Sequence, residues 1–96
     1  HRVSLEVSDI AFVESNDSEV WIHTTHDKHR TKTTISQWES ILDNGDFVRI
    51  HRAYIVNRRH ITSLNSSSVM VAESELPISR KYRDIAKEKC SAEQNR

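Results

Sequence analysis

The sequence contains few of the residues from which catalytic, metal or disulfide-linked sites are usually built. Its 96 residues include one cysteine, one glycine and one proline, and aromatic residues make up 6% of the chain. One thiol, Cys90, can form neither an internal disulfide nor a cysteine-based zinc cluster. One glycine cannot build a glycine-rich phosphate loop or the nucleophile elbow of a hydrolase. We therefore expect no enzyme, no cofactor and no metal site, and an unreactive Cys90 on a surface helix.

The chain also has no long apolar run and no signal peptide. Apolar residues never approach the roughly 20 in a row that span a bilayer. We therefore expect a cytoplasmic protein and no membrane contact by this segment. The length fits one small domain, residues 1–96, with an ordered core at about residues 3–88. Because the chain does not begin with methionine, we expect it to be a fragment of a longer protein.

An excess of charge of one sign is missing as well. Lys and Arg together number 14, as do Asp and Glu, so the net charge is zero. Nucleic-acid-binding domains are usually basic, so the total by itself argues against such a partner. The distribution differs from the total, because residues 47–72 contain four arginines and no Asp or Glu. A neutral chain can therefore present one cationic face.

What the sequence does contain is short runs in which apolar and polar residues alternate. A period of two is typical of half-buried strands, and Asn, Asp and Ser separate the runs as turn residues. Strands are expected at residues 3–7, 10–14, 19–23, 29–34, 47–56 with a break at 51–53, 61–64, 69–72 and 76–78. Turns are expected at residues 16–18, 27–28, 65–68 and 73–75. The pattern predicts a mainly β fold of small antiparallel sheets, with Pro77 in an edge strand.

Two segments change to helical spacing. Ser36 and Glu39 have the spacing of a capping box, in which both side chains satisfy free backbone N–H groups at a helix start. The buried face of this mid-chain helix is expected to carry Trp38, Ile41 and Leu42. Gly45 is expected at the C′ position, where a left-handed residue ends a helix. A C-terminal helix is expected to begin with Ser79 as N-cap, followed at helical spacing by Tyr82, Ile85 and Ala86.

The segment at residues 47–58 carries the strongest chemical signal. Its side chains with hydrogen-bond donors are Arg49, His51, Arg52, Tyr54, Asn57 and Arg58. Arginine can donate two bonds to a phosphate or to the acceptor edge of guanine, and Asn and Tyr can add contacts to the DNA backbone. The pattern therefore indicates a nucleic-acid contact. The alternative is a solvated edge strand whose cations only prevent pairing with other chains.

A second cationic segment begins at Ser79. Arg80 and Lys81 follow directly, so positive charge and the free N–H groups of a helix start would lie together, which suits a phosphate oxygen. Cations near a helix N-terminus oppose the helix dipole, and a broken local rule often marks a functional site. The alternative is an ordinary capped helix with Tyr82 and Ile85 packed inward.

Three histidines, His23, His26 and His29, stand three residues apart. On a helix this spacing can assemble a metal site, but here the three fall on a strand, a turn and a second strand, where they share no face. No carboxylate or thiol pattern completes the set, so we expect no metal.

Three blocks of the sequence are similar, in the same order, to the pattern of one known family. The first comprises residues 9–15 and 20–24, the second is FVRIHRAYIVN at residues 47–57, and the third is LPISRKY at residues 76–82. In this order they resemble the LytTR DNA-binding domain of bacterial response regulators. The middle block is long and specific, and the resemblance covers about residues 3–88.

This resemblance implies the output domain of a transcriptional regulator, in which loops of a mostly antiparallel β fold enter successive major grooves of double-stranded DNA. It implies base or phosphate contacts by the loop near Glu19 and by His51, Arg52, Arg80 and Lys81. It implies supporting or phosphate contacts by Arg49, Tyr54, Asn57, Arg58 and Ser79. It also implies an upstream receiver or sensor domain of a two-component system, and dimers on direct-repeat sites. Glu19 departs from the family pattern, in which a neutral or aromatic residue is common at this position. An acid there would repel phosphate or accept from a cytosine amino group.

Two other functions remain open at this point. A small β-rich protein-interaction module could use a cationic face to bind an acidic partner. Competition between specific and random duplexes separates it from a DNA-binding domain, whereas salt dependence does not. Single-strand binding requires exposed aromatic side chains for base stacking, and most aromatic residues here fall at positions expected in the core.

Overall fold

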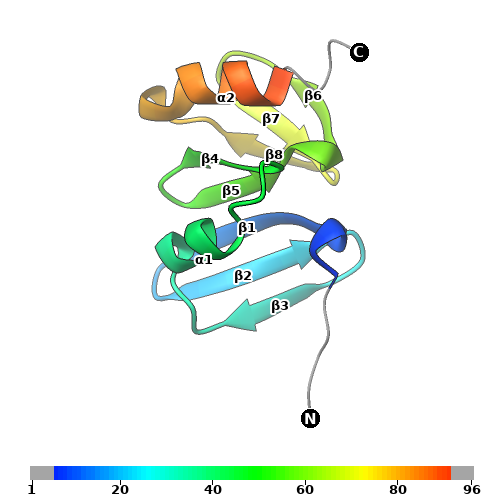
Figure 1. The fold of residues 1–96 in the computed structure, drawn as a ribbon, viewed down its shortest axis with the longest axis vertical. Helices are drawn as coiled ribbons and strands as arrows, with labels where there is room; N and C mark the ends of the chain where they lie inside the picture. The colour runs from blue at the N-terminus through cyan, green and yellow to red at the C-terminus, as the bar shows by residue number, and fades with distance from the viewer. Residues whose placement is uncertain (1–5, 92–96) are drawn as a thin grey trace.

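The computed structural model describes residues 6–91, which form two antiparallel sheets and two α-helices (Figure 1). The five-stranded sheet has the order β3-β2-β1-β5-β4 and consists of β1 (Ile10–Asn16), β2 (Glu19–Thr24), β3 (Lys28–Thr31), β4 (Phe47–His51) and β5 (Tyr54–Asn57). The three-stranded sheet has the order β6-β7-β8 and consists of β6 (Ile61–Leu64), β7 (Ser68–Val71) and β8 (Ser74–Pro77). The helices are α1 (Ile35–Ile41) and α2 (Arg83–Ser91). The predicted mainly β class is confirmed.

The central strand β1 is buried on both faces. Its first four residues, 10–13, are all buried, so the run is continuously apolar instead of alternating. The register with β2 shifts between Ile10 and Phe12, as in a β-bulge, where one extra residue re-aims the side chains. Ala11 and Phe12 consequently enter one core, while Ile10 and Val13 enter the other.

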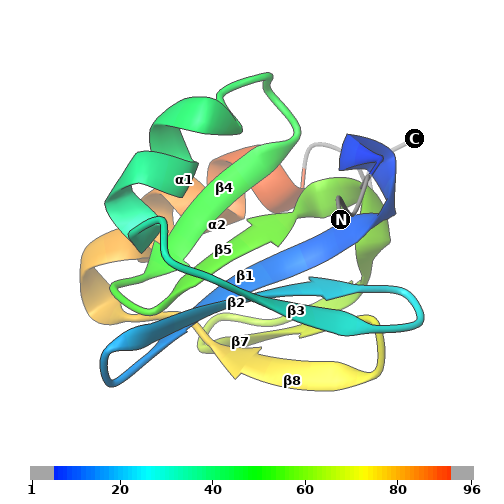
Figure 2. The same cartoon turned by 90° about the horizontal axis from the view of Figure 1, so that it is seen from below.

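The two cores lie on opposite faces of the five-stranded sheet. Figure 2 shows α1 above this sheet and strands β7 and β8 below it. The core between the two sheets and α2 contains Ala11, Phe12, Val48, Ile50, Val56, Val69, Val71, Leu76, Ile78, Ala86 and Cys90. The core under α1 contains Ile10, Val13, Val20, Ile22, Ile35, Leu42 and Ile55, with Trp38 and Phe47 packed against it. The five-stranded sheet is therefore packed on both faces, which fixes the positions of the turns at the ends of its strands.

Helix α1 begins two residues earlier than the sequence predicted. Thr34 is the N-cap: its hydroxyl accepts from the Gln37 N–H at 3.2 Å, and the Gln37 side chain accepts from the Thr34 N–H at 2.9 Å. The prediction of a cap at Ser36 is therefore wrong. The face of α1 that packs on the sheet carries Ile35, Trp38 and Leu42. Ile41, which the sequence placed on this face, is 62% exposed.

The end of α1 also differs from the prediction. The helix ends at Ile41 with Leu42 as C-cap, and the Leu42 N–H donates to the Trp38 carbonyl. Gly45 is not at C′ but further along the turn that leads to β4, where its φ of +89° is the left-handed conformation that glycine tolerates. Strand β3 likewise ends at Thr31 and not at residue 34, because residues 32–34 are needed to reach the cap.

The turn between β7 and β8 is Ala72-Glu73, not residues 73–75 as predicted. Both residues have positive φ values, 48° and 68°, as in the two-residue hairpin turns whose twist matches that of the strands. Strand pairing here overrides the residue preference, because Val71 and Ser74 are cross-strand partners. Pro77 does lie in β8, an edge strand of the three-stranded sheet, as predicted.

Both ends of the described chain differ from expectation. Val7 belongs to a 3₁₀ turn, Val7–Asp9, and not to a strand; the rest of the strand predicted at residues 3–7 lies largely outside the described residues. Helix α2 extends past residue 88, and Cys90 on it is 0% exposed, so the expected surface position of this thiol is wrong. Neither helix of the described chain is long and apolar enough to cross a membrane.

Candidate nucleic-acid interface

Three connections, taken together with the strand ends beside them, lie along one edge of the molecule: the β1–β2 turn (residues 16–18), the β4–β5 turn (residues 51–54), and the β8–α2 connection (residues 78–82). Figures 1 and 2 both show them on the left-hand side. The Ser15 N–H donates to the Ala53 carbonyl at 2.8 Å, and the Ser79 N–H donates to the Ile50 carbonyl at 2.9 Å. The β4–β5 turn is thus bonded to the end of β1, and the β8–α2 connection is bonded to β4. We call these three connections the loop edge.

The β4–β5 turn presents His51 and Arg52. Arg52 is exposed, and His51 is partly exposed. The His51 Nδ1 accepts from the Ala53 N–H at 3.1 Å, which assigns the ring proton of a neutral imidazole to Nε2. The ring lies 5.5 Å from the Tyr54 ring, centroid to centroid. His51 therefore has its Nε2–H as a donor, on a partly exposed ring that contacts Ala53 and Tyr54.

Arg49, two residues before His51, points inward instead. Its side chain is 11% exposed. Its Nε donates to the His51 carbonyl at 2.8 Å, and its Nη2 donates to the Arg52 carbonyl at 2.7 Å. Its Nη1 donates to the Glu39 carboxylate of α1 at 2.6 Å. All three guanidinium nitrogens are used within the protein, so Arg49 supports the turn.

The β8–α2 connection carries Arg80 and Lys81 on a 3₁₀ turn, Arg80–Tyr82, and α2 begins only at Arg83. The Ser79 side chain makes no capping hydrogen bond, so the prediction that it caps the terminal helix is wrong. The Tyr82 N–H instead donates to the Ser79 backbone carbonyl at 2.9 Å. Arg80 and Lys81 therefore lie before the first residue of α2, and both are exposed. The Lys81 ammonium lies 5.5 Å from the Tyr82 ring centroid.

The loop edge gathers exposed cations that have no carboxylate partner within residues 6–91. They are Arg52, Arg80, Lys81 and, at the start of α2, Arg83. Arg83 was not among the residues expected to contact DNA, although it directly follows the third block and its charge continues that of Lys81. At the other end of the edge, Glu19 pairs with Arg30 at 2.9 Å, which reduces the negative charge of the β1–β2 turn.

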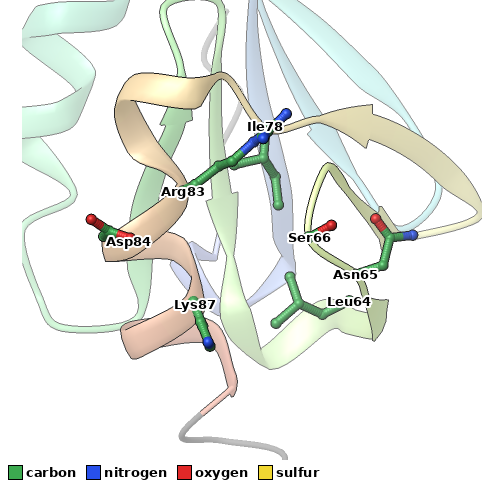
Figure 3. A pocket seen from close by; sticks show the side chains of 7 residues that line it. All are labelled: Leu64, Asn65, Ser66, Ile78, Arg83, Asp84 and Lys87. Carbon is green, nitrogen blue, oxygen red and sulfur yellow. The ribbon is translucent and has the colours of Figure 1, made fainter.

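Arg83 extends the cationic surface toward the β6–β7 turn. Between this turn and α2 is a hollow of about 360 Å³ with Leu64 and Ile78 in its wall (Figure 3). In Figure 3 the Arg83 side chain reaches toward Ile78 and away from Asp84. The Ile78 N–H donates to the Ser67 carbonyl at 2.9 Å, which ties the β6–β7 turn to the loop edge.

Tyr54, the first residue of β5, contacts side chains of the sheet beneath the turn. It pairs with Glu14 of β1, and the Glu14 carboxylate also accepts from His23 Nε2 at 2.8 Å. Burial raises the pKa of Tyr54, and the nearby Glu14 charge and a hydrogen bond to Glu14 raise it further. The His23 ring stacks on Phe12 with centroids 4.1 Å apart. Tyr54 therefore links the turn to the sheet.

Asn57 and Arg58 lie at the opposite end of β5, away from the loop edge. Asn57 is 1% exposed, and its amide donates to the Ile10 carbonyl at 2.9 Å. Arg58 Nη1 donates to the Lys89 carbonyl near the end of α2 at 3.0 Å, and Nε lies 3.8 Å from Asp46. The structure does not bring these two residues together with His51 and Arg52.

The three histidines do not converge. His23 is in β2 and bonds Glu14, His26 is in the β2–β3 turn, and His29 is in β3 opposite Ile22. Within residues 6–91 no three His, Cys, Asp or Glu side chains are grouped so as to hold a metal ion.

Comparisons with known proteins agree on one family. A family model described as the LytTr DNA-binding domain matches residues 1–91. The sensory transduction protein LytT of Bacillus anthracis is 33% identical over 86 residues, which cover 83% of this chain and 35% of that protein. The sensory transduction protein LytR of Staphylococcus haemolyticus is 39% identical over 56 residues, which cover 58% of this chain and 22% of that protein.

A solved LytTr DNA-binding domain from Bacillus cereus has the same fold. It superimposes with a TM-score of 0.82 at 20% identity, covering 91% of this chain and 85% of that chain. At this identity the likeness concerns the fold alone. The present chain covers about a third or less of the two curated relatives above.

Proposed function

The chain belongs to the LytTr DNA-binding domain family, and on that premise we propose that it binds double-stranded DNA sequence-specifically through the loop edge, as the output domain of a bacterial transcriptional regulator. The family assignment confirms the resemblance seen in the three sequence blocks. The manner of binding and the contacting residues are our inference from the geometry.

The observation that carries the proposal is the cationic loop edge. Three connections from distant parts of the chain expose Arg52, Arg80 and Lys81, none of which has a carboxylate partner in the described chain, and Arg83 at the start of α2 adds a fourth such cation. Backbone hydrogen bonds tie Ala53 to the end of β1 and Ser79 to β4. The molecule measures 41 Å along its longest axis, against about 34–36 Å for one turn of B-DNA. In Figure 1 the connections follow one another along this axis. Loops spaced in this way can enter successive major grooves from one side of the duplex.

We assign roles by what each side chain has available. His51 and Arg52, at the tip of the β4–β5 turn, offer donors to base edges or phosphates. Arg80 and Lys81 do the same from the 3₁₀ turn, and we assign a phosphate contact to the Ser79 hydroxyl, which makes no capping hydrogen bond. The supporting residues are Arg49 and Tyr54 at the turn and Asn57 and Arg58 at the far end of β5.

The proposal extends to the longer protein. The chain covers 35% of the length of LytT, so a relative of that size has room for an upstream receiver or sensor domain. We propose dimers on direct repeats, which would double the length of DNA that is contacted. Binding to bacterial DNA would place the protein in the cytoplasm. Gel filtration with and without a repeated site measures the dimerisation part.

The test is selection from a pool of random duplexes, followed by fluorescence anisotropy with the enriched sequence. We expect an enriched repeated motif. Arg52→Ala and Lys81→Ala should each weaken binding to it by roughly five- to a hundredfold, the range for losing one base contact. Both side chains are exposed, so the thermal unfolding of the variants should match that of the wild type.

The matched control is Arg59→Ala. Arg59 is an exposed cation in the turn after β5, at the end of the strand opposite the loop edge, and it pairs with Asp46. Its loss removes the same charge but should change specific binding little. Binding without enrichment would reduce the loop edge to a generic polyanion site. No binding at low salt would favour a protein-interaction module with an acidic partner.

A further inference from the structure

Glu39 and Arg49 connect helix α1 to the carbonyl groups at the tip of the β4–β5 turn. Arg49 donates from Nε to the His51 carbonyl at 2.8 Å and from Nη2 to the Arg52 carbonyl at 2.7 Å. Its remaining nitrogen, Nη1, donates to Glu39 at 2.6 Å. The two carbonyl groups belong to the residues whose side chains we assign to DNA.

The local backbone needs such support. The register of β4 with β5 shifts between Arg49 and His51, so the regular ladder is interrupted just before the turn. A planar guanidinium has its donors in a rigid fork, so it can hold two acceptors in one fixed relation, which a lysine ammonium cannot do. Glu39 neutralises the largely buried guanidinium and orients it from the side of α1.

We propose that Arg49 and Glu39 are positioning residues that determine sequence discrimination: they hold the β4–β5 turn so that His51 and Arg52 meet DNA in one orientation, and neither touches DNA. The inference rests on the proposed function and deepens it. A pre-set turn loses less conformational freedom on binding, and the gain falls on the cognate sequence, whose contacts require the exact orientation of both side chains.

Glu39→Gln gives the most informative experiment, because charge and positioning predict opposite signs. Glu39 is half-exposed and negative, so if it acted through charge alone its removal would strengthen DNA binding. Positioning predicts weaker binding to the selected duplex, by roughly three- to tenfold, because a neutral amide oxygen can keep one hydrogen bond to the guanidinium but loses the attraction between opposite charges. Binding to random duplex should stay within about twofold.

The matched control is Asp43→Asn. Asp43 is an acid just beyond α1 that lines the same hollow as Glu39 and Arg49 but pairs with no cation in the described chain. Its neutralisation removes the same charge from the same region without loosening Arg49. We expect it to leave discrimination unchanged or to strengthen both kinds of binding slightly.

Arg49→Lys separates positioning from phosphate contact. The variant keeps the charge, so a phosphate contact would survive in part. We expect a loss of roughly tenfold or more on the selected duplex, in line with lost charge-assisted hydrogen bonds. The slope of log K against log salt should remain that of the wild type, because no phosphate contact is lost.

Amide hydrogen exchange provides a readout that needs no DNA. The Ala53 N–H bonds His51 Nδ1 inside the turn, and it should exchange faster in Glu39→Gln and Arg49→Lys than in Asp43→Asn. If the wild type fails to discriminate duplexes while these rates rise, the proposed function fails and the positioning of the turn stands. Unchanged rates, or tighter specific binding by Glu39→Gln, overturn the positioning role.

Discussion

The Asn57 side chain donates a 2.9 Å hydrogen bond to the backbone carbonyl of Ile10, 47 residues earlier in the chain. Both residues are buried, and the Asn57 Oδ1 also accepts from the Arg59 N–H at 3.0 Å. One amide therefore satisfies two backbone groups where β5 ends and β1 begins. A residue that the sequence offered as a DNA contact has no atom left at the surface for that role.

Asn57→Ala should therefore reduce stability and leave DNA affinity per folded molecule unchanged. Leaving the Ile10 carbonyl buried without a donor costs about 1–3 kcal/mol. Urea denaturation measures the loss, with Asn16→Ala, an exposed asparagine at the end of β1, as a control that should change stability by less than about 0.5 kcal/mol. A variant as stable as the wild type but weak on the selected duplex would restore Asn57 as a direct contact.

The capping box of α1 gives a second comparison. Thr34→Ala removes the hydroxyl that accepts from the Gln37 N–H, and it should cost about 1 kcal/mol in the free energy of unfolding. Ser36→Ala removes the alternative cap that the sequence favoured and should change stability by less than about 0.5 kcal/mol. Chemical denaturation of both variants decides between the two boxes, and equal losses would mean that the helix start is not fixed at Thr34.

Cys90 should react slowly in the folded protein. Burial raises the pKa of this thiol to about 11, although the Arg58 charge lowers it in part, so almost no thiolate is present at neutral pH. We expect the rate of labelling by a disulfide reagent to rise sharply only when urea unfolds the chain. Rapid labelling under native conditions would show that α2 opens at this position.

The same shift predicts how stability depends on pH. The unfolded thiol ionises near its ordinary value of 9.0, below the folded value of about 11, so its contribution is fully present below pH 9 and is lost as pH rises toward 11. Because Tyr54 also has a raised pKa, the quantity to measure is the difference between wild type and Cys90→Ala. That difference should shrink with rising pH across this window.

Arg52 and Arg58 should respond differently to substitution by alanine. Arg52→Ala should lower the slope of log K against log salt by about one if the side chain contacts a phosphate. Arg58→Ala should leave the slope unchanged and reduce stability, since Arg58 bonds the Lys89 carbonyl and lies beside Asp46. Salt titrations and thermal unfolding of both variants test this, and a lower slope for Arg58→Ala would place DNA at both ends of β5.

Several parts of the fold follow from local pattern. The break at residues 51–53 separates β4 from β5, and Pro77 lies in an edge strand, because turns and missing donors act over a few residues. The cap of α1 does not follow in this way. Thr34 with Gln37 and Ser36 with Glu39 have the same spacing, so spacing cannot choose between them; in the structure the first forms the box, Ile35 is buried, and Glu39 pairs with Arg49.

By itself the sequence determined the mainly β class, the family and the two cationic segments, since alternation, charge and motif are properties of neighbouring residues. Only the tertiary structure decided which donors remain available to a ligand. Arg49 and Arg52 are chemically identical and three residues apart, yet one is bonded to Glu39 and two carbonyls while the other is exposed. Whether a side chain meets solvent or the protein depends on what packs beside it from elsewhere in the chain, and hydrogen bonds such as that from Asn57 to Ile10 join residues that no local pattern relates.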